Sequence, residues 1–165
     1  MEVRKALLND IPLLLPLALE TFRDTYFHLN TPENFQLYVR ENFTEAIFQQ
    51  ELNDPTADYW LAFIDNALVG YAKTRSNAQY PLLLEVQRLY IAKAWHRQGL
   101  GTKLMDFCLT VAQQNQFEGI FLGVWEENHK AIAFYQSCGF EIFDKHIFVL
   151  GEDPQEDWLM KKTFA

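Results

Sequence analysis

Gly99 and Gly101 stand at the start of a helical pattern, where they could help to hold a phosphate group. They end the stretch LLLEVQRLYIAKAWHRQGLGT, residues 82–102, which reads as a strand, a short loop and a glycine-rich turn that opens into a helix. Without side chains, the two glycines let the backbone approach a ligand and present free amides to it. These N–H groups and the positive end of the helix dipole favour a phosphate or pyrophosphate. A protein that holds a phosphorylated cofactor is therefore indicated, with a plain glycine turn as the alternative.

The charge distribution agrees with an anion site at this turn. Residues 86–105 contain four lysines and arginines and no carboxylate, whereas residues 7–57 contain eight carboxylates and two arginines. A basic stretch in a chain of net charge −8 suggests an anion site, and the acidic stretch would attract cations. Two solvated faces without function are the alternative. The glycines match neither established phosphate motif: Leu104 stands where G-x-G-x-x-G needs its third glycine, and no G-x-x-x-x-G-K-[ST] occurs.

A second group of polar residues follows the glycines at a fixed distance. Asn128 can cap a helix, and Tyr135 lies two turns later on the same side. The segment H-R-Q-G-L-G-T, followed at this distance by N-x6-Y-x3-G-F, resembles the GNAT superfamily of N-acetyltransferases over residues 85–140. The phrases ETFRDTY, TPENF, RLYI, LGVWEENHKAIAFY and DWLMKKT are most similar to bacterial PaiA-type polyamine N-acetyltransferases, and this likeness covers almost the whole chain.

The resemblance implies a fold, a cofactor and a set of binding residues. The fold would be α/β (α+β), with one mixed, mostly antiparallel twisted sheet flanked by helices and two central parallel strands that splay to hold acetyl-CoA. The superfamily motif begins with Gln or Arg where this chain has His96, which leaves the side-chain contributions of His96 and Arg97 open. The main-chain pyrophosphate site, the strand that pairs with the pantetheine arm and the helix that follows would supply the cofactor contacts: His96, Arg97, Gln98, Gly99, Leu100, Gly101 and Thr102; Leu89, Tyr90 and Ile91; and Asn128 and Tyr135.

Amide formation requires a base, an oxyanion donor and an acid. A primary ammonium has a pKa of about 10.4, so a base must help to remove its proton. Glu85, a carboxylate inside the central strand, is the candidate, with a water chain or a solvent-facing role as alternatives. A backbone amide near Tyr90 or Ile91 would stabilise the tetrahedral oxyanion. Tyr135, with a reference pKa of about 10 against about 8.5 for a thiol, would protonate the leaving thiolate.

We expect the acceptor to be a small cationic amine, spermidine or spermine above all. The resemblance places the acidic stretch 7–57 at the acceptor pocket, where carboxylates could pair with ammonium groups: Glu20, Asp24, Glu33 and Glu41. Two alternatives stay open, a protein or peptide amine as acceptor and a CoA-sensing regulatory module without turnover. The aromatic content would also allow a homodimer.

The elements that must position these residues follow from periodicity and caps. We expect strands at 2–7, 82–91 and 119–124, a hairpin of YWLAFI and ALVGYAKTR around Asp65-Asn66, and two closing strands, EIFDKHIFV and EDWLMKK. Helices are expected at 11–26, capped by Asn9 or Asp10 and kinked or delayed by Pro16, at 32–42, at 44–52 capped by Thr44, at 101–115 and at 128–138. The helix at 101–115 shows an apolar face typical of a core helix: Leu100, Leu104, Phe107, Cys108 and Val111.

Composition limits the remaining possibilities. At 165 residues and 49% hydrophobic content the chain fits a single globular domain, residues 1–165. We expect a cytoplasmic protein without a membrane span, and the net charge of −8 argues against nucleic acid as a partner. The histidines are dispersed and form no metal-ligand pattern, and no base stands beside Cys138 to make it a nucleophile.

Overall fold

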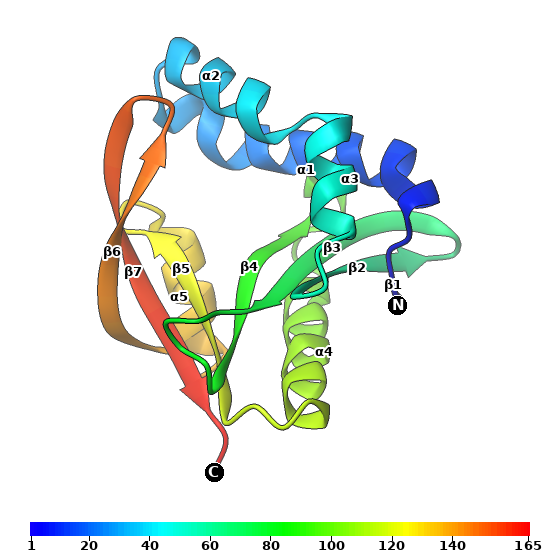
Figure 1. The fold of residues 1–165 in the computed structure, drawn as a ribbon, viewed down its shortest axis with the longest axis vertical. Coiled ribbons are helices and arrows are strands. Elements are labelled where there is room, and N and C mark those ends of the chain that lie inside the picture. Colours follow the sequence, from blue (N-terminus) through cyan, green and yellow to red (C-terminus); the bar gives the residue numbers. More distant parts are fainter.

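The computed structural model describes residues 1–165, except for the side chain of Phe148, and shows a sheet with helices on both of its faces (Figure 1). The helices are α1 (Ile11–Tyr26), α2 (Pro32–Asn42), α3 (Glu45–Leu52), α4 (Leu100–Gln114) and α5 (His129–Ser137). The strands are β1 (Glu2–Lys5), β2 (Ala57–Ile64), β3 (Ala67–Ser76), β4 (Leu83–Ile91), β5 (Gly119–Trp125), β6 (Glu141–Leu150) and β7 (Asp153–Thr163).

The strands form a seven-stranded sheet in the order β1-β2-β3-β4-β5-β7-β6. Only the central pair β4–β5 is parallel among the neighbouring pairs of described strands, and the other pairs are antiparallel. The predicted fold class, a mixed and mostly antiparallel sheet with two central parallel strands, is confirmed.

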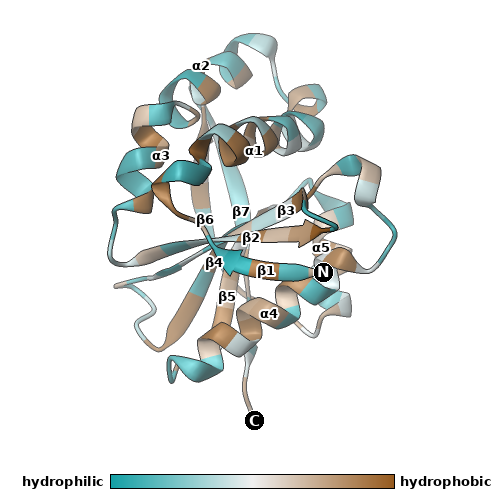
Figure 2. Ribbon diagram, turned by 90° about the vertical axis from the view of Figure 1, so that its right-hand side faces the viewer, coloured by the Kyte–Doolittle hydropathy of each residue, from teal (hydrophilic) through white to brown (hydrophobic). Residues whose placement is uncertain are grey.

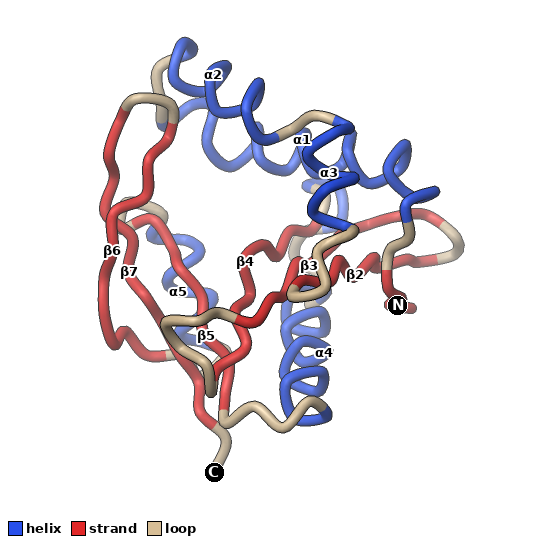
Figure 3. Tube along the Cα trace, viewed as in Figure 1, coloured by secondary structure: helices blue, strands red, loops and turns tan.

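The parallel pair is short, and the two strands then separate. β4 pairs with β5 only from Leu83 to Glu85, opposite Gly119 to Phe121. Just beyond this ladder Gln87 forms a β-bulge, because Val86 pairs with Thr74 and Arg88 with Lys73. A bulge bends its strand, and Figures 1 and 3 show β4 and β5 meeting at one end and diverging towards the other. The second half of β4 therefore has an edge that β5 does not cover.

Two apolar clusters hold the helices on the sheet. On one face, α4 and α5 pack on β4, β5 and β7; on the other, α1, α2 and α3 pack on β2 and β3. Figure 2 shows apolar and polar segments alternating along α4, as expected for a helix with one buried face. The buried residues of α4 are Leu100, Leu104, Met105, Cys108, Val111 and Ala112, while the predicted core residue Phe107 is partly buried against Trp60.

Local sequence signals explain most element boundaries. Asp65 and Asn66 both have positive φ, as a tight hairpin turn requires, and Thr44 Oγ1 accepts the Ile47 amide at 3.2 Å to cap α3. One expectation about α1 was wrong, because the carboxylate of Asp10 does not cap α1 but accepts the Leu7 amide at 2.7 Å. Of the two effects expected of Pro16, the delay does not occur, since α1 begins at Ile11 and runs through Pro16.

Candidate active site

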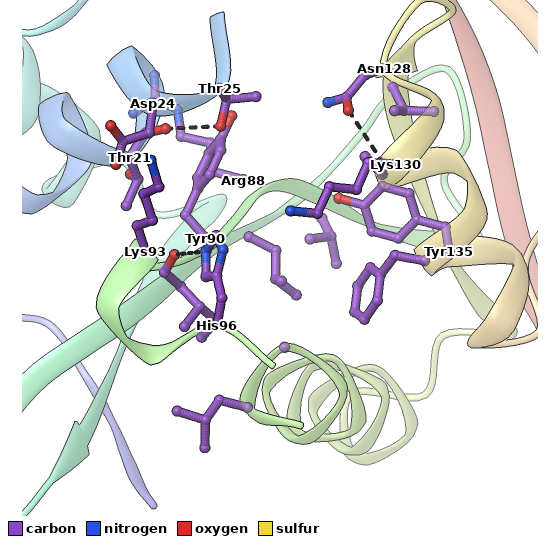
Figure 4. Close-up of a pocket in the computed structure, with 18 of the residues that line it drawn as sticks. Thr21, Asp24, Thr25, Arg88, Tyr90, Lys93, His96, Asn128, Lys130 and Tyr135 are labelled. Carbon is purple, nitrogen blue, oxygen red and sulfur yellow. Dashed lines mark hydrogen bonds between the residues drawn. The ribbon is translucent and has the colours of Figure 1, made fainter. Parts of the chain in front are cut away.

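A cavity of about 560 Å³ lies where β4 leaves β5 (Figure 4). Its walls come from the end of α1, the second half of β4, the loop from Lys93 to Thr102, Gly123 of β5 and the first two turns of α5. The cavity therefore joins the two faces of the sheet through the gap between its central strands. Such a gap at the end of parallel strands is a common ligand site.

The wall formed by the start of α4 is suited to an anion. Gly99, the residue before the helix, has φ +73°, and Arg97 has φ +63°. A non-glycine residue held in this region costs about 1–2 kcal/mol, and such conformations gather at functional sites. No side chain caps α4, and the first intrahelical bond from the Lys103 amide reaches Gly99 O at 3.1 Å. The amides of residues 100–102 thus lack helical partners, and all three residues line the cavity.

Basic side chains surround this helix start. Lys93, His96, Arg97 and Lys130 all line the cavity, and Figure 4 shows Lys130 reaching in from the α5 side. The His96 ring does not point at the helix start, because its Nε2 donates to the Ile91 carbonyl at 2.7 Å. His96 therefore holds the loop against the end of β4, and the cationic side chains and free amides together are suited to bind an anion.

α5 carries the two polar residues of the second motif. Asn128 Oδ1 accepts the Ala131 amide at 3.3 Å, so the predicted helix cap is confirmed, and the residue also lines the cavity. Tyr135 lies on the same wall (Figure 4). Burial, with the nearby thiols Cys138 and Cys108 adding to it, raises the pKa of Tyr135 to about 12. The phenol therefore keeps its proton at neutral pH.

Of the residues predicted to bind the cofactor, all line this cavity except Gln98. Glu85, the predicted base, does not line it either. Glu85 accepts hydrogen bonds from Arg75 Nε at 2.5 Å and from Asn77 Nδ2 at 2.9 Å, at the closed end where β4 still pairs with β5. The structure thus does not bring Glu85 together with Tyr135, and its role as base stays an untested prediction.

Only one of the four carboxylates predicted to bind the acceptor lines the cavity. Asp24, near the end of α1, lines the cavity, whereas Glu20, Glu33 and Glu41 are exposed and do not. The acceptor side of the cavity is also less acidic than the sequence suggested, because Arg88 lies there.

Arg88 belongs to a buried polar cluster that the sequence analysis missed. Its Nη1 donates to the Tyr59 hydroxyl at 2.9 Å, and Tyr59 donates in turn to Glu51, which also pairs with Lys73 Nζ at 3.1 Å. The guanidinium lies 5.3 Å from the centre of the Phe43 ring. Glu51 of α3 is the anion that these two buried cations share, so the cluster ties β3 and β4 to the helices above them.

Asp157 of β7 is a second residue that the sequence analysis missed. It is 8% exposed, and its Oδ1 has no hydrogen-bond partner among the described residues. Burial raises the pKa of this carboxyl to about 7. In the alternation of EDWLM, Asp157 shares a face with the buried Leu159, and a carboxylate at such a position was the available signal.

Other chemistry finds less support in the described residues. Burial raises the pKa of the Cys108 thiol to about 12 and also raises that of Cys138, which disfavours the thiolate that an acyl-cysteine would need. No group of three or more His, Cys, Asp and Glu side chains gathers among the described residues to hold a metal ion. Across the same described part of the chain, no helix has the length and apolarity to span a bilayer.

Comparisons with known proteins point to one family. The sequence model of the acetyltransferase (GNAT) family matches residues 19–140. An uncharacterized N-acetyltransferase from the pepI 3′ region of Lactobacillus delbrueckii subsp. lactis is 32% identical over 162 residues, covering 95% of this chain and 94% of its own. The PaiA N-acetyltransferase of Thermoplasma acidophilum, solved in complex with coenzyme A, has a TM-score of 0.83 at 22% identity and covers 99% of this chain and 98% of its own.

Relatives with named acceptors differ in what those acceptors are. A spermidine N(1)-acetyltransferase of Thermoplasma acidophilum is 23% identical, with 99% of this chain and 97% of the relative covered. An N-alpha-acetyltransferase 50 of Danio rerio is 33% identical over 144 residues, with 81% and 84% covered. The comparisons therefore agree on the kind of reaction and leave the acceptor open.

Proposed function

Since the chain belongs to the acetyltransferase (GNAT) family and is an acetyl-CoA-dependent N-acetyltransferase, we propose that it acetylates a primary amine of a small cationic acceptor, a polyamine such as spermidine or spermine. The cosubstrate would lie in the cavity between β4 and β5. The observation that carries this placement is the free edge of β4 opposite the uncapped start of α4, both on one cavity.

In this proposal each wall of the cavity holds one part of acetyl-CoA. The amides of residues 100–102, with the nearby cations, bind the diphosphate. The backbone from Leu89 to Ile91 offers an unpaired strand edge to the pantetheine amides, and the amide group of Asn128 lies across the cavity from it. Because His96 already occupies the Ile91 carbonyl, the pairing depends on the other main-chain groups of this segment.

In this proposal the acetyl group passes directly from the thioester to the amine, and residues of the chain assist this step. The bound thioester supplies an activated acetyl carbonyl, which the amine attacks. A main-chain amide near Tyr90 stabilises the oxyanion, and Tyr135 donates its phenolic proton to the departing sulfur. With its pKa at about 12, full transfer to a thiol of pKa about 8.5 is uphill by about 5 kcal/mol. Tyr135 therefore donates its proton in step with C–S cleavage, so that the collapse of the tetrahedral intermediate offsets this cost, and it regains a proton from water.

Two observations support a polyamine as the acceptor. Asp24 at the α1 side of the cavity can pair with a second ammonium group while the first meets the acetyl group. The similarity to a spermidine acetyltransferase over almost the whole chain points the same way. Against it stand the cations on the same cavity and the similarity to an N-alpha-acetyltransferase, so a peptide amine is the second candidate.

The test is release of the free thiol of CoA from acetyl-CoA in the presence of a panel of amines. We expect spermidine and spermine to react faster than butylamine and faster than a peptide with a free α-amino group. Asp24→Asn should raise KM for spermidine about 2–5-fold, as for an exposed ion pair, and leave butylamine unaffected. Preference for the peptide would reject the polyamine assignment, and no thiol above hydrolysis with any amine would favour the CoA sensor.

A further inference from the structure

Resting on the proposed function, we infer that Asp157 is the catalytic base, and that its carboxylate accepts the proton of the acceptor ammonium. The first reason is its position. In the sheet, Asp157 pairs in register with Trp125 of β5 and His146 of β6, so it lies beside the strand that borders the cavity. The side chains of Asp157 and Trp125 share the sheet face on which Trp125 meets Tyr26 of α1, opposite to the face of α4 and α5, and Gly123 lies at the same face two residues before Trp125.

Asp157 itself does not line the cavity, but its carboxylate lies next to Gly123, which does. Gly123 is exposed and lines the cavity, and a Cβ atom at this position would lie 3.4 Å from Asp157 Oδ2. The same Cβ would lie 3.1 Å from His146 Cε1. A side chain here would therefore fill the space above Asp157. With glycine, a ligand nitrogen on this side of the cavity can come within hydrogen-bond reach of Oδ2.

The buried carboxylate lacks the partners that a structural aspartate would have. Asp157 Oδ1 is buried with no hydrogen-bond partner among the described residues, and none of their lysines or arginines pairs with the group. An unpaired buried carboxylate is costly for a fold. An ammonium group entering past Gly123 would supply both the missing charge and the missing donor.

The groups that face Asp157 leave it free to titrate near neutral pH. Burial chiefly raises the pKa values of Tyr26 of α1 and Tyr38 of α2, and the nearby Asp157 carboxylate adds to both shifts. His146 faces Asp157 from β6. Arg88 of β4 lies on the same side of the sheet but is engaged by Glu51 and Tyr59. Desolvation therefore dominates and raises the pKa of the Asp157 carboxyl to about 7. At this pKa the carboxylate binds a proton roughly a thousandfold more tightly than an ordinary aspartate does.

All protons of the reaction are accounted for when Asp157 is the base and Tyr135 the acid. The ammonium R–NH3+ gives one proton to the Asp157 carboxylate, and the free amine forms its C–N bond to the thioester carbon. When the tetrahedral intermediate collapses, the C–S bond breaks, Tyr135 protonates the sulfur, and the nitrogen loses its second proton to water. Asp157 and Tyr135 then exchange protons with solvent, and the reaction releases one proton overall.

The test compares the pH dependence of kcat/KM for the wild type and for Asp157→Asn. We expect the wild-type value to fall below about pH 7, as Asp157 becomes protonated in the free enzyme. Asp157→Asn should lower kcat/KM at pH 8 at least 100-fold, abolish that acid limb, and keep the dissociation constant for CoA within about twofold. Glu156→Gln, which changes the next carboxylate of β7, is the matched control and should behave as wild type. His146→Gln should keep the acid limb, which excludes the imidazole as its source.

Two outcomes would overturn the inference. One is an Asp157→Asn enzyme that keeps its rate within threefold and its acid limb. The other comes from the carboxyl 13C resonance of Asp157 in the wild-type protein, which needs no variant to fold: titration near pH 4, or no change in its pKa with saturating amine and CoA. If the wild type binds CoA but releases no thiol with any amine, the proposed function is wrong, and so is the assignment of Asp157 as its base. If only the variant comparison fails, the proposed function stands.

Discussion

Asp157→Asn is expected to stabilise the fold at pH 8 even though it removes activity. In the folded protein the pKa of Asp157 is raised from 3.8 to about 7, so the native state binds a proton more tightly than the unfolded chain. Stability is therefore lost as pH rises from about 4 to 7, and the loss is complete above the folded pKa. A shift of about three units at 1.36 kcal/mol each amounts to about 4 kcal/mol.

Asparagine would recover part of this energy, since it stays neutral at every pH. Its own buried amide, if unpaired, costs about 1–2 kcal/mol, so we expect a net gain of about 2–3 kcal/mol at pH 8. At pH 4, where aspartate is protonated in the fold, only the cost of the amide remains, and the variant should be about 1–2 kcal/mol less stable than wild type. Urea unfolding at both pH values measures the difference. A variant less stable than wild type at pH 8 would refute the reasoning, because it would mean that the carboxylate has a partner in the fold.

Four further substitutions test other parts of the site. Tyr135→Phe should lower kcat about 100-fold, the lower end of the usual contribution of a general acid, and leave CoA affinity within twofold by calorimetry; a collapse of affinity at unchanged rate would reverse the assignment. Gly99→Ala should weaken CoA binding, because φ +73° costs a residue with Cβ about 1–2 kcal/mol; unchanged affinity in the same titration would contradict the anion site. Gly123→Ala should raise KM for the amine and spare CoA affinity, and equal effects on both in steady-state kinetics would place the acceptor elsewhere. Cys138→Ala should keep the rate within about twofold, and loss of thiol release would point to an acyl-cysteine.

Local signals predicted the elements well because they depend on neighbouring residues. The apolar face of α4, the caps Thr44 and Asn128 and the turn at Asp65-Asn66 are each decided within a few residues, and each is found in the structure. The glycine turn likewise predicted residues 96–102 as one side of the ligand site, and all of them except Gln98 line the cavity.

The acid–base residues were harder to predict because their state depends on distant strands. Glu85 looks available in the sequence, yet Arg75 from β3 neutralises it. The bulge at Gln87 also reverses the alternation along β4, so the faces of later residues cannot be counted from Glu85. Asp157 is buried only through its contacts with β5, β6 and α1. No pattern within the last ten residues shows that its carboxylate lies beside the cavity.

The three-residue ladder between Leu83–Glu85 and Gly119–Phe121 has a mechanical consequence. It is the only direct strand pairing between β1–β4 and β5–β7 among the described residues, so the sheet consists of two sections joined at one corner. A long, thin ligand laid along the open seam would act as an inserted eighth strand and clamp the sections together. Backbone amides along both sides of the seam should then exchange their hydrogens more slowly in its presence, while those of β1 and β2 change little.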